Sequence, residues 1–184
     1  PFLAAPSVLQ KDQISQLEQQ IATAELELKS STTPQSKPVE SIWIDDALPP
    51  GAQPFGNGSG PQEFLFVRAD DHPVHSGKKS SQRTSTGLGQ HGFQNAQPLM
   101  VSQDAKLFTW VYLDPQNPPK EIILQWHGAN GWNHRAYWGG NHINWGADKS
   151  PTRQPMGPLP QAGEWVRLEV NAAADGLPQR SHIN

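Results

Sequence analysis

Proline and glycine interrupt this chain too often for long helices to form over most of its length. It holds 18 Pro and 16 Gly in 184 residues, about 18% together against an average near 12%. Both residue types are typical of turns, so the sequence predicts short elements joined by tight connections. After residue 41, short β-like runs alternate with such connections, and no helical pattern lies between them.

Residues Leu107–Leu113 give the clearest strand pattern, with Phe108, Trp110 and Tyr112 expected on one face. A proline-rich turn follows at residues 114–119, and Glu121–Trp126 returns as the next strand, which predicts a hairpin. Other predicted strands are Ile42–Ile44, Phe64–Val67, Leu99–Val101, Trp132–Trp138, Ile143–Trp145 and Trp165–Val170, with a long loop over residues 70–90. This pattern predicts a mainly β fold, an antiparallel jelly-roll β-sandwich without parallel βαβ units.

The segment before the strands has the one sustained helical pattern. Apolar residues recur at steps of three and four within residues 8–29, and polar residues stand between them. The narrow stripe suits a coiled-coil-like arm, and packing against the sandwich is the alternative. The predicted organisation is a helical segment over 1–29, a linker over 30–40 and a β-sandwich module over 41–184.

Several segments resemble one particular family of modules. They are Leu107–Ile122, Leu124–Trp126, His134–Gly139 and Gly163–Val170. The segments are similar to a module within large secreted cytochrome-like proteins of planctomycetes, and more loosely to concanavalin A-like (laminin G-like) jelly rolls. The resemblance implies a secreted, periplasmic or cell-surface location within a larger chain that carries haem regions and domains of unknown function. It also implies further strands after Leu177, so we expect a module that lacks its last strand or strands.

Charge and composition exclude several classes of function for this chain. The net charge of −3 offers no basic patch for nucleic acid. No apolar run approaches the ~20 residues of a membrane span. Without cysteine, the chain has no disulfide, thiolate metal site, thiol catalysis or Cys-linked haem of its own, so we expect no cofactor except a candidate structural calcium.

Aromatic and polar residues gather between residues 126 and 145, where rings could stack on sugar faces and polar groups could bind hydroxyls. Strand periodicity places Arg135 and Tyr137 on the face opposite Trp132 and His134. The predicted ligand-binding residues are Arg135, Tyr137, Trp126, Trp132, His134 and Asn141. The alternative is that the tryptophans are core residues and the polar residues are solvated or cap turns.

The sequence patterns for metal binding are weaker than the aromatic and polar cluster at residues 126–145. Asp70, Asp71 and His72, with His75 and His91, are candidate zinc ligands, although the same residue types are ordinary turn chemistry. Calcium prefers carboxylate and carbonyl oxygens. Asp45 and Asp46 are the candidate calcium ligands, with Asp70, Asp71 and Asp148 as further carboxylates that no spacing selects.

Catalysis has no support in the sequence. A glycosidase needs two facing carboxylates, and nothing pairs the strand residues Glu121 and Glu169. No nucleophile elbow, phosphate loop or zinc-protease motif appears. We therefore expect a non-catalytic carbohydrate-binding module whose partners are a polysaccharide or glycan and other domains of its parent chain. A structural spacer or protein-interaction module is the alternative, and a concanavalin A-like glycosidase is the third.

Overall fold

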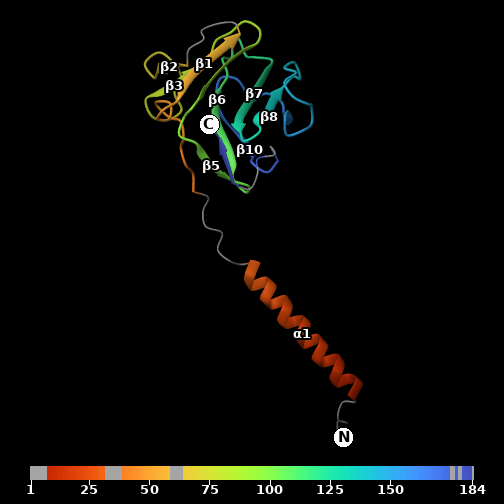
Figure 1. The fold of residues 1–184 in the computed structure, drawn as a ribbon. Helices are drawn as coiled ribbons and strands as arrows, with labels where there is room; N and C mark the ends of the chain where they lie inside the picture. Colours follow the sequence, from red (N-terminus) through yellow and green to blue (C-terminus); the bar gives the residue numbers. More distant parts are fainter. Residues whose placement is uncertain (1–7, 32–38, 59–63, 175–176, 178–179, 184) are drawn as a thin grey trace. The chain divides into compact units, whose positions relative to one another are not determined.

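A computed structural model describes residues 8–31, 39–58, 64–174, 177 and 180–183 (Figure 1). The chain divides into two compact units, Pro1–Ser41 and Ile42–Asn184. The first contains a helix and the second is mainly β, as the sequence predicts. Most of the predicted linker, residues 32–38, lies outside the described residues.

The helix of the first unit, α1, spans Val8–Ser31. Its sequence is rich in Gln, Glu, Leu and Ala, which are good helix formers, and it contains neither Gly nor Pro. Thr23 donates its hydroxyl hydrogen bond to the carbonyl of Gln19 (2.9 Å), so this β-branched polar residue is satisfied within the helix. The helix ends at Ser31, two residues past the predicted end at residue 29.

The second unit is built from short strands. They are β1 (Gln53–Gly58), β2 (Leu65–Arg68), β3 (Lys79–Gln82), β4 (Gly89–Gln94), β5 (Leu99–Ser102), β6 (Lys106–Tyr112), β7 (Glu121–Gly128), β8 (Gly131–Gly139), β9 (Gln154–Gly157), β10 (Trp165–Asn171) and β11 (Arg180–Ile183). Antiparallel pairs join β1 to β4, β2 to β3, β5 to β11 and β6 to β10. Strands β7, β8 and β9 form a further sheet. Figure 1 shows β6 and β10 between β1–β3 on one side and β7–β8 on the other.

The predicted hairpin between residues 107–113 and 121–126 is wrong. Strand β6 pairs with β10, and β7 pairs with β8. The β7–β8 connection is a tight turn at residues 129–130 followed by Gly131 at a φ of +79°, so closing this hairpin costs little chain entropy. After β6, by contrast, the Asp114 carboxylate accepts the Gln116 backbone N–H (2.9 Å) and starts a separate turn.

Two predicted strands are also absent. Residues 42–44 and 143–145 are described without strand structure. Around Ile143, side chains rather than a neighbouring strand take up the backbone groups. Its N–H donates to Glu121 Oε2 (2.9 Å), and its carbonyl accepts from Arg153 Nη1 (2.7 Å). Apolar composition alone therefore gave a false strand signal there.

Other strands were not predicted, because they lack alternating apolar residues. Strand β3 and the start of β4 fall within the predicted loop at residues 70–90, and β1 contains Pro and Gly. Strand β9 pairs in parallel with β8 across Ala136↔Gln154. Because this parallel connection contains no described helix, the exclusion of βαβ units holds, but the expectation of a wholly antiparallel fold does not.

The core consists of two contiguous clusters. One is formed by Val101, Ala172, Leu177 and Ile183, and the other by Ala136, Trp138, Leu168 and Val170. Trp126 packs against both clusters. Strand β10 alternates Val166, Leu168 and Val170 toward this core with polar and aromatic residues on its other face.

Leu168→Ala tests the assignment of the core. Leu168 is 4% exposed, so its truncation is expected to lower the free energy of unfolding by about 2–5 kcal/mol. Leu88→Ala, at a side chain that is 49% exposed, should change it by less than about 0.5 kcal/mol. Urea denaturation followed by tryptophan fluorescence measures both, and equal effects of the two substitutions would contradict the assignment.

Candidate functional site

One face of the β6–β10 pair carries Trp110, the one Phe, Tyr or Trp residue among the described residues that is exposed rather than partly or fully buried. The register places Tyr112 opposite Trp165, Trp110 opposite Arg167, and Phe108 opposite Glu169. Their neighbours in sequence turn toward the core, so these residues share the other face. We call the set Phe108, Trp110, Tyr112, Trp165, Arg167 and Glu169 the aromatic face.

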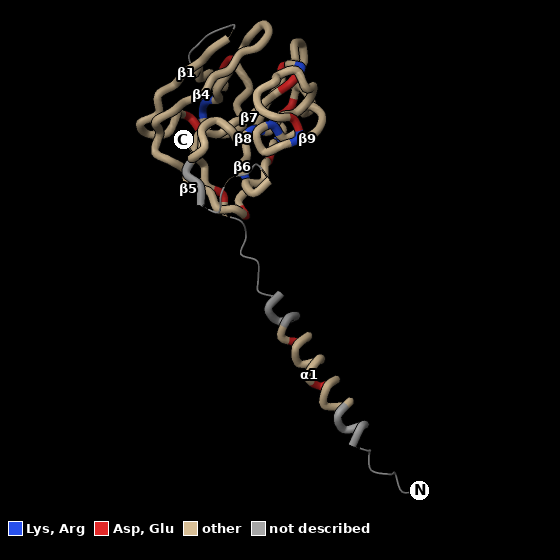
Figure 2. Tube along the Cα trace, turned by 45° about the vertical axis from the view of Figure 1, so that its right-hand side comes forward, with Lys and Arg blue, Asp and Glu red and all other residues tan. Residues whose placement is uncertain are grey.

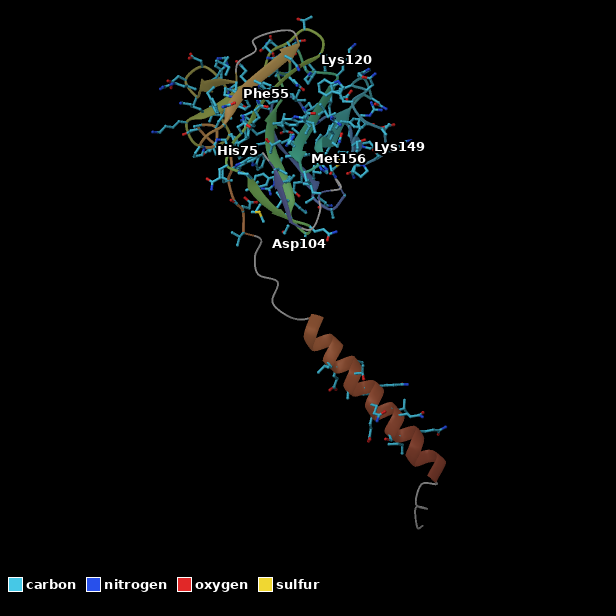
Figure 3. The ribbon with its side chains drawn as sticks, viewed as in Figure 1. Phe55, His75, Asp104, Lys120, Lys149 and Met156 are labelled. Carbon is cyan, nitrogen blue, oxygen red and sulfur yellow. The ribbon has the colours of Figure 1, made fainter. Side chains whose placement is uncertain are left out.

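The rings of the aromatic face meet near Trp110, whose side chain is 36% exposed. The imidazole of His75 stacks on the indole of Trp110, with centroids 3.9 Å apart and planes at 18°. His75 also meets Trp165 edge to face at 5.7 Å, and Trp165 lies 5.7 Å from Tyr112 at an angle of 55° (Figure 3 labels His75). Such contacts fix the ring orientations and leave apolar ring surface next to water.

The other end of the aromatic face is charged. The guanidinium of Arg167 lies 3.8 Å above the centroid of Phe108. Arg167 Nε donates to Glu169 Oε1 (2.7 Å), and Lys106 Nζ donates to Glu169 Oε2 (2.9 Å). The hydrogen bond from Lys106 is the larger cause, and the one from Arg167 the next, of a Glu169 pKa below its usual value. Stacking surface and oriented polar groups therefore lie side by side on one sheet.

Two carboxylates hold the segment that supplies His75. Asp46 Oδ1 accepts the backbone N–H groups of Lys78 (2.6 Å) and Lys79 (2.7 Å), and Asp45 Oδ1 accepts the hydroxyl of Ser76 (3.3 Å). The Lys78 N–H lowers the pKa of Asp46. The candidate calcium ligands Asp45 and Asp46 are thus used to fix the backbone next to His75.

Of the predicted ligand-binding residues, Arg135 and Tyr137 do share one face of β8. Tyr137 is only 6% exposed and donates to Asp148 Oδ1 (2.9 Å). Burial, followed by the Asp148 contact, raises the pKa of Tyr137. Arg135 donates to Gln125 Oε1 (3.2 Å) and to the Thr152 carbonyl (3.1 Å). Both side chains therefore bind residues 148–152 to the sheet, where they contribute to internal structure.

The other predicted residues lie elsewhere. Trp126 packs in the core, opposite the buried His134 in the β7–β8 register. Trp132 contacts Phe55 edge to face at 5.8 Å and His127 at 5.2 Å. Asn141 is exposed in the connection after β8. The structure does not gather the six predicted residues around one surface.

The candidate zinc ligands are also distributed over separate environments. His72 Nδ1 lies 3.3 Å from Gln82 Nε2, and His91 stacks on Phe64 at 4.5 Å. Asp70 and Asp71 lie in the turn after β2. Among the described residues, no three His, Asp or Glu side chains are grouped closely enough to hold a metal ion.

His91 gives the second, mainly β unit (the β domain) a pH dependence of stability. Burial, and then repulsion from Arg83, lowers the pKa of His91 below the ordinary 6.5. The unfolded chain therefore binds a proton more readily, so the free energy of unfolding falls as the pH drops below about 6.5. His91→Phe should remove this component from denaturation midpoints measured between about pH 5 and 8. The exposed control His72→Phe should retain it, and an unchanged slope in His91→Phe would contradict the assignment.

Comparison with known proteins assigns no family to the chain. No protein-family model, curated protein or solved structure matches it. Within the described residues, no helix is both long and apolar enough to cross a membrane. Function must therefore be inferred from the chemistry of the side chains, of which the aromatic face is the most distinctive arrangement.

Proposed function

We propose that this chain is a non-catalytic carbohydrate-binding module and that the aromatic face binds the glycan. The observation that carries the proposal is Trp110, which is 36% exposed and held in a ring cluster beside the oriented Arg167–Glu169 pair. The apolar face of a pyranose can stack on such rings. Its hydroxyls can accept hydrogen bonds from guanidinium and ammonium groups and donate to a carboxylate.

The location of the charged groups favours a sugar over a polyanion such as nucleic acid. Lys106 and Arg167 both bind Glu169, so one of the two positive charges beside Phe108 is neutralised within the cluster. Figure 2 shows basic and acidic residues interspersed along the trace of the β domain. A polyanion needs an accumulation of positive charge, whereas a neutral or weakly charged glycan needs aromatic surface and balanced polar groups.

Two carboxylates support the non-catalytic part of the proposal. Glu121 Oε2 accepts the N–H groups of His142 (2.5 Å) and Ile143 (2.9 Å), and Glu169 is held by two cations. The glycosidase alternative would require paired carboxylates that face a shared substrate. Glu169 is instead committed to two cations that lower its pKa, and Oε2 of Glu121 is committed to two backbone N–H groups.

The proposal also covers the fold of the module and its location. We take the antiparallel pairs around two core clusters as a jelly-roll sandwich, in which β6 and β10 present their outer face to the ligand. The module would belong to a larger secreted, periplasmic or cell-surface protein, where it would attach other domains of that chain to polysaccharide. Structural calcium remains a proposal that metal titration by calorimetry can test.

Trp110→Ala is expected to weaken glycan binding at least tenfold, about 1.4 kcal/mol, because it removes the most exposed ring. Trp110→Phe keeps an aromatic ring and should bind with intermediate affinity. Leu88→Ala, exposed on another segment, should bind as the wild type does. A glycan array selects the polysaccharide, and affinity gels containing it compare the variants. Absence of binding to every glycan at millimolar concentration would favour the spacer alternative.

Tyr137→Phe and Arg135→Ala separate the aromatic face from the surface predicted at β8. Losing the Tyr137–Asp148 hydrogen bond should lower the free energy of unfolding by about 1 kcal/mol, and both variants should retain glycan binding. Urea denaturation and the same affinity gels provide the two readouts. Loss of binding in both variants, with near-ultraviolet circular dichroism unchanged, would place the glycan site at Arg135 and Tyr137 instead.

A further inference from the structure

Helix α1 carries an apolar seam with the spacing of a coiled coil. Ile14, Leu17, Ile21, Ala24 and Leu28 follow one another at alternating steps of three and four residues. This spacing places Ile14, Ile21 and Leu28 at position a of a heptad and Leu17 and Ala24 at position d. The seam runs about 21 Å along the helix.

Within the first unit, no other described residue covers the seam. All described side chains of α1, residues 13–26, are exposed, and those of Leu17 and Ile21 are each 58% exposed. Helices in water gain most of their stability by packing an apolar face against a partner. An exposed seam of Ile and Leu therefore calls for an occupant.

The residue types along the seam favour a second copy of the same helix. Ile14 and Ile21 at position a, with Leu17 at position d, form the combination that favours two parallel strands. Ala24 and Leu28 extend the apolar seam without adding to that preference. We propose that α1 pairs in parallel and in register with α1 of a second copy of this chain. The pairing is independent of glycan binding at the aromatic face.

The flanking positions agree with the parallel arrangement. The charged residues among 13–26 are Glu18 and Glu25, both at position e, and Figure 2 shows no basic residue there. In a parallel pair, each faces a glutamine at position g of the partner helix, Gln13 and Gln20 respectively. An antiparallel pair would place these e positions opposite each other and bring glutamates of the two copies together.

Sedimentation velocity of the full chain tests the pairing from about 1 μM to about 1 mM, the range of weak association. The wild type should shift from monomer to dimer as concentration rises. Leu17→Glu should remain monomeric, because it places a charge at position d while keeping a good helix former. Leu26→Glu makes the same change at position f, off the seam, and should dimerise as the wild type does.

Far-ultraviolet circular dichroism at equal concentration provides a second readout: Leu26→Glu should match the wild type, whereas the monomeric Leu17→Glu should lose helix signal, because pairing stabilises α1. A wild type that stays monomeric throughout the range would overturn the proposal. Equal dimerisation of the wild type and Leu17→Glu would also overturn it, since the interface would then lie elsewhere.

The absence of native cysteine allows a direct test of orientation. A disulfide requires Cα atoms within about 7 Å. Ile14→Cys should therefore form a disulfide-linked dimer on oxidation if the helices are parallel and in register. In an antiparallel pair with Ile14 opposite Ala24, the two introduced thiols would be about 15 Å apart along the helix axis. Leu26→Cys, pointing away from the seam, is the matched control, and equal linkage of the two variants would overturn the parallel pairing.

Discussion

The ladder between β6 and β10 joins two surfaces of opposite chemistry through one set of backbone hydrogen bonds. Leu168 and Val170 enter the core on one side, and Trp110 and Trp165 form part of the aromatic face on the other. Because side chains alternate along a strand, a register slip of one residue would exchange the two surfaces. Core packing therefore fixes the position of the rings, and the proposed binding surface depends on the same register that stabilises the domain.

Local periodicity was sufficient to predict which residues of one strand share a face. It placed Phe108, Trp110 and Tyr112 together, and likewise Arg135 with Tyr137, as the structure has them. Periodicity carries no information about the partner of a strand, which explains the incorrect hairpin. Strand β7 pairs with β8 across a short loop, whereas β6 pairs with a strand more than 50 residues away. Such long-range pairing is not encoded in the local pattern of either strand.

The aromatic face was harder to predict because its contacts are distant in sequence. His75 comes from a segment that reads as a polar loop, and it stacks on Trp110 next to backbone that Asp46 holds through the N–H of Lys78. Likewise, Tyr137 donates to Asp148 in an irregular segment whose backbone is held by the side chains of Arg153 and Glu121. Side chain-to-backbone bonds of this kind leave no repeating pattern in the sequence.

The pairing of β11 with β5 also has a consequence for how the domain folds. Ile183 lies opposite Leu99, and Ile183 shares a core cluster with Val101. Contacts between residues so distant in sequence form slowly, typically on timescales of milliseconds to seconds for domains dominated by them. Until β11 arrives, the edge of β5 lacks this partner and offers a template for other chains. The rate of this pairing would then affect how long a newly made domain is exposed to aggregation.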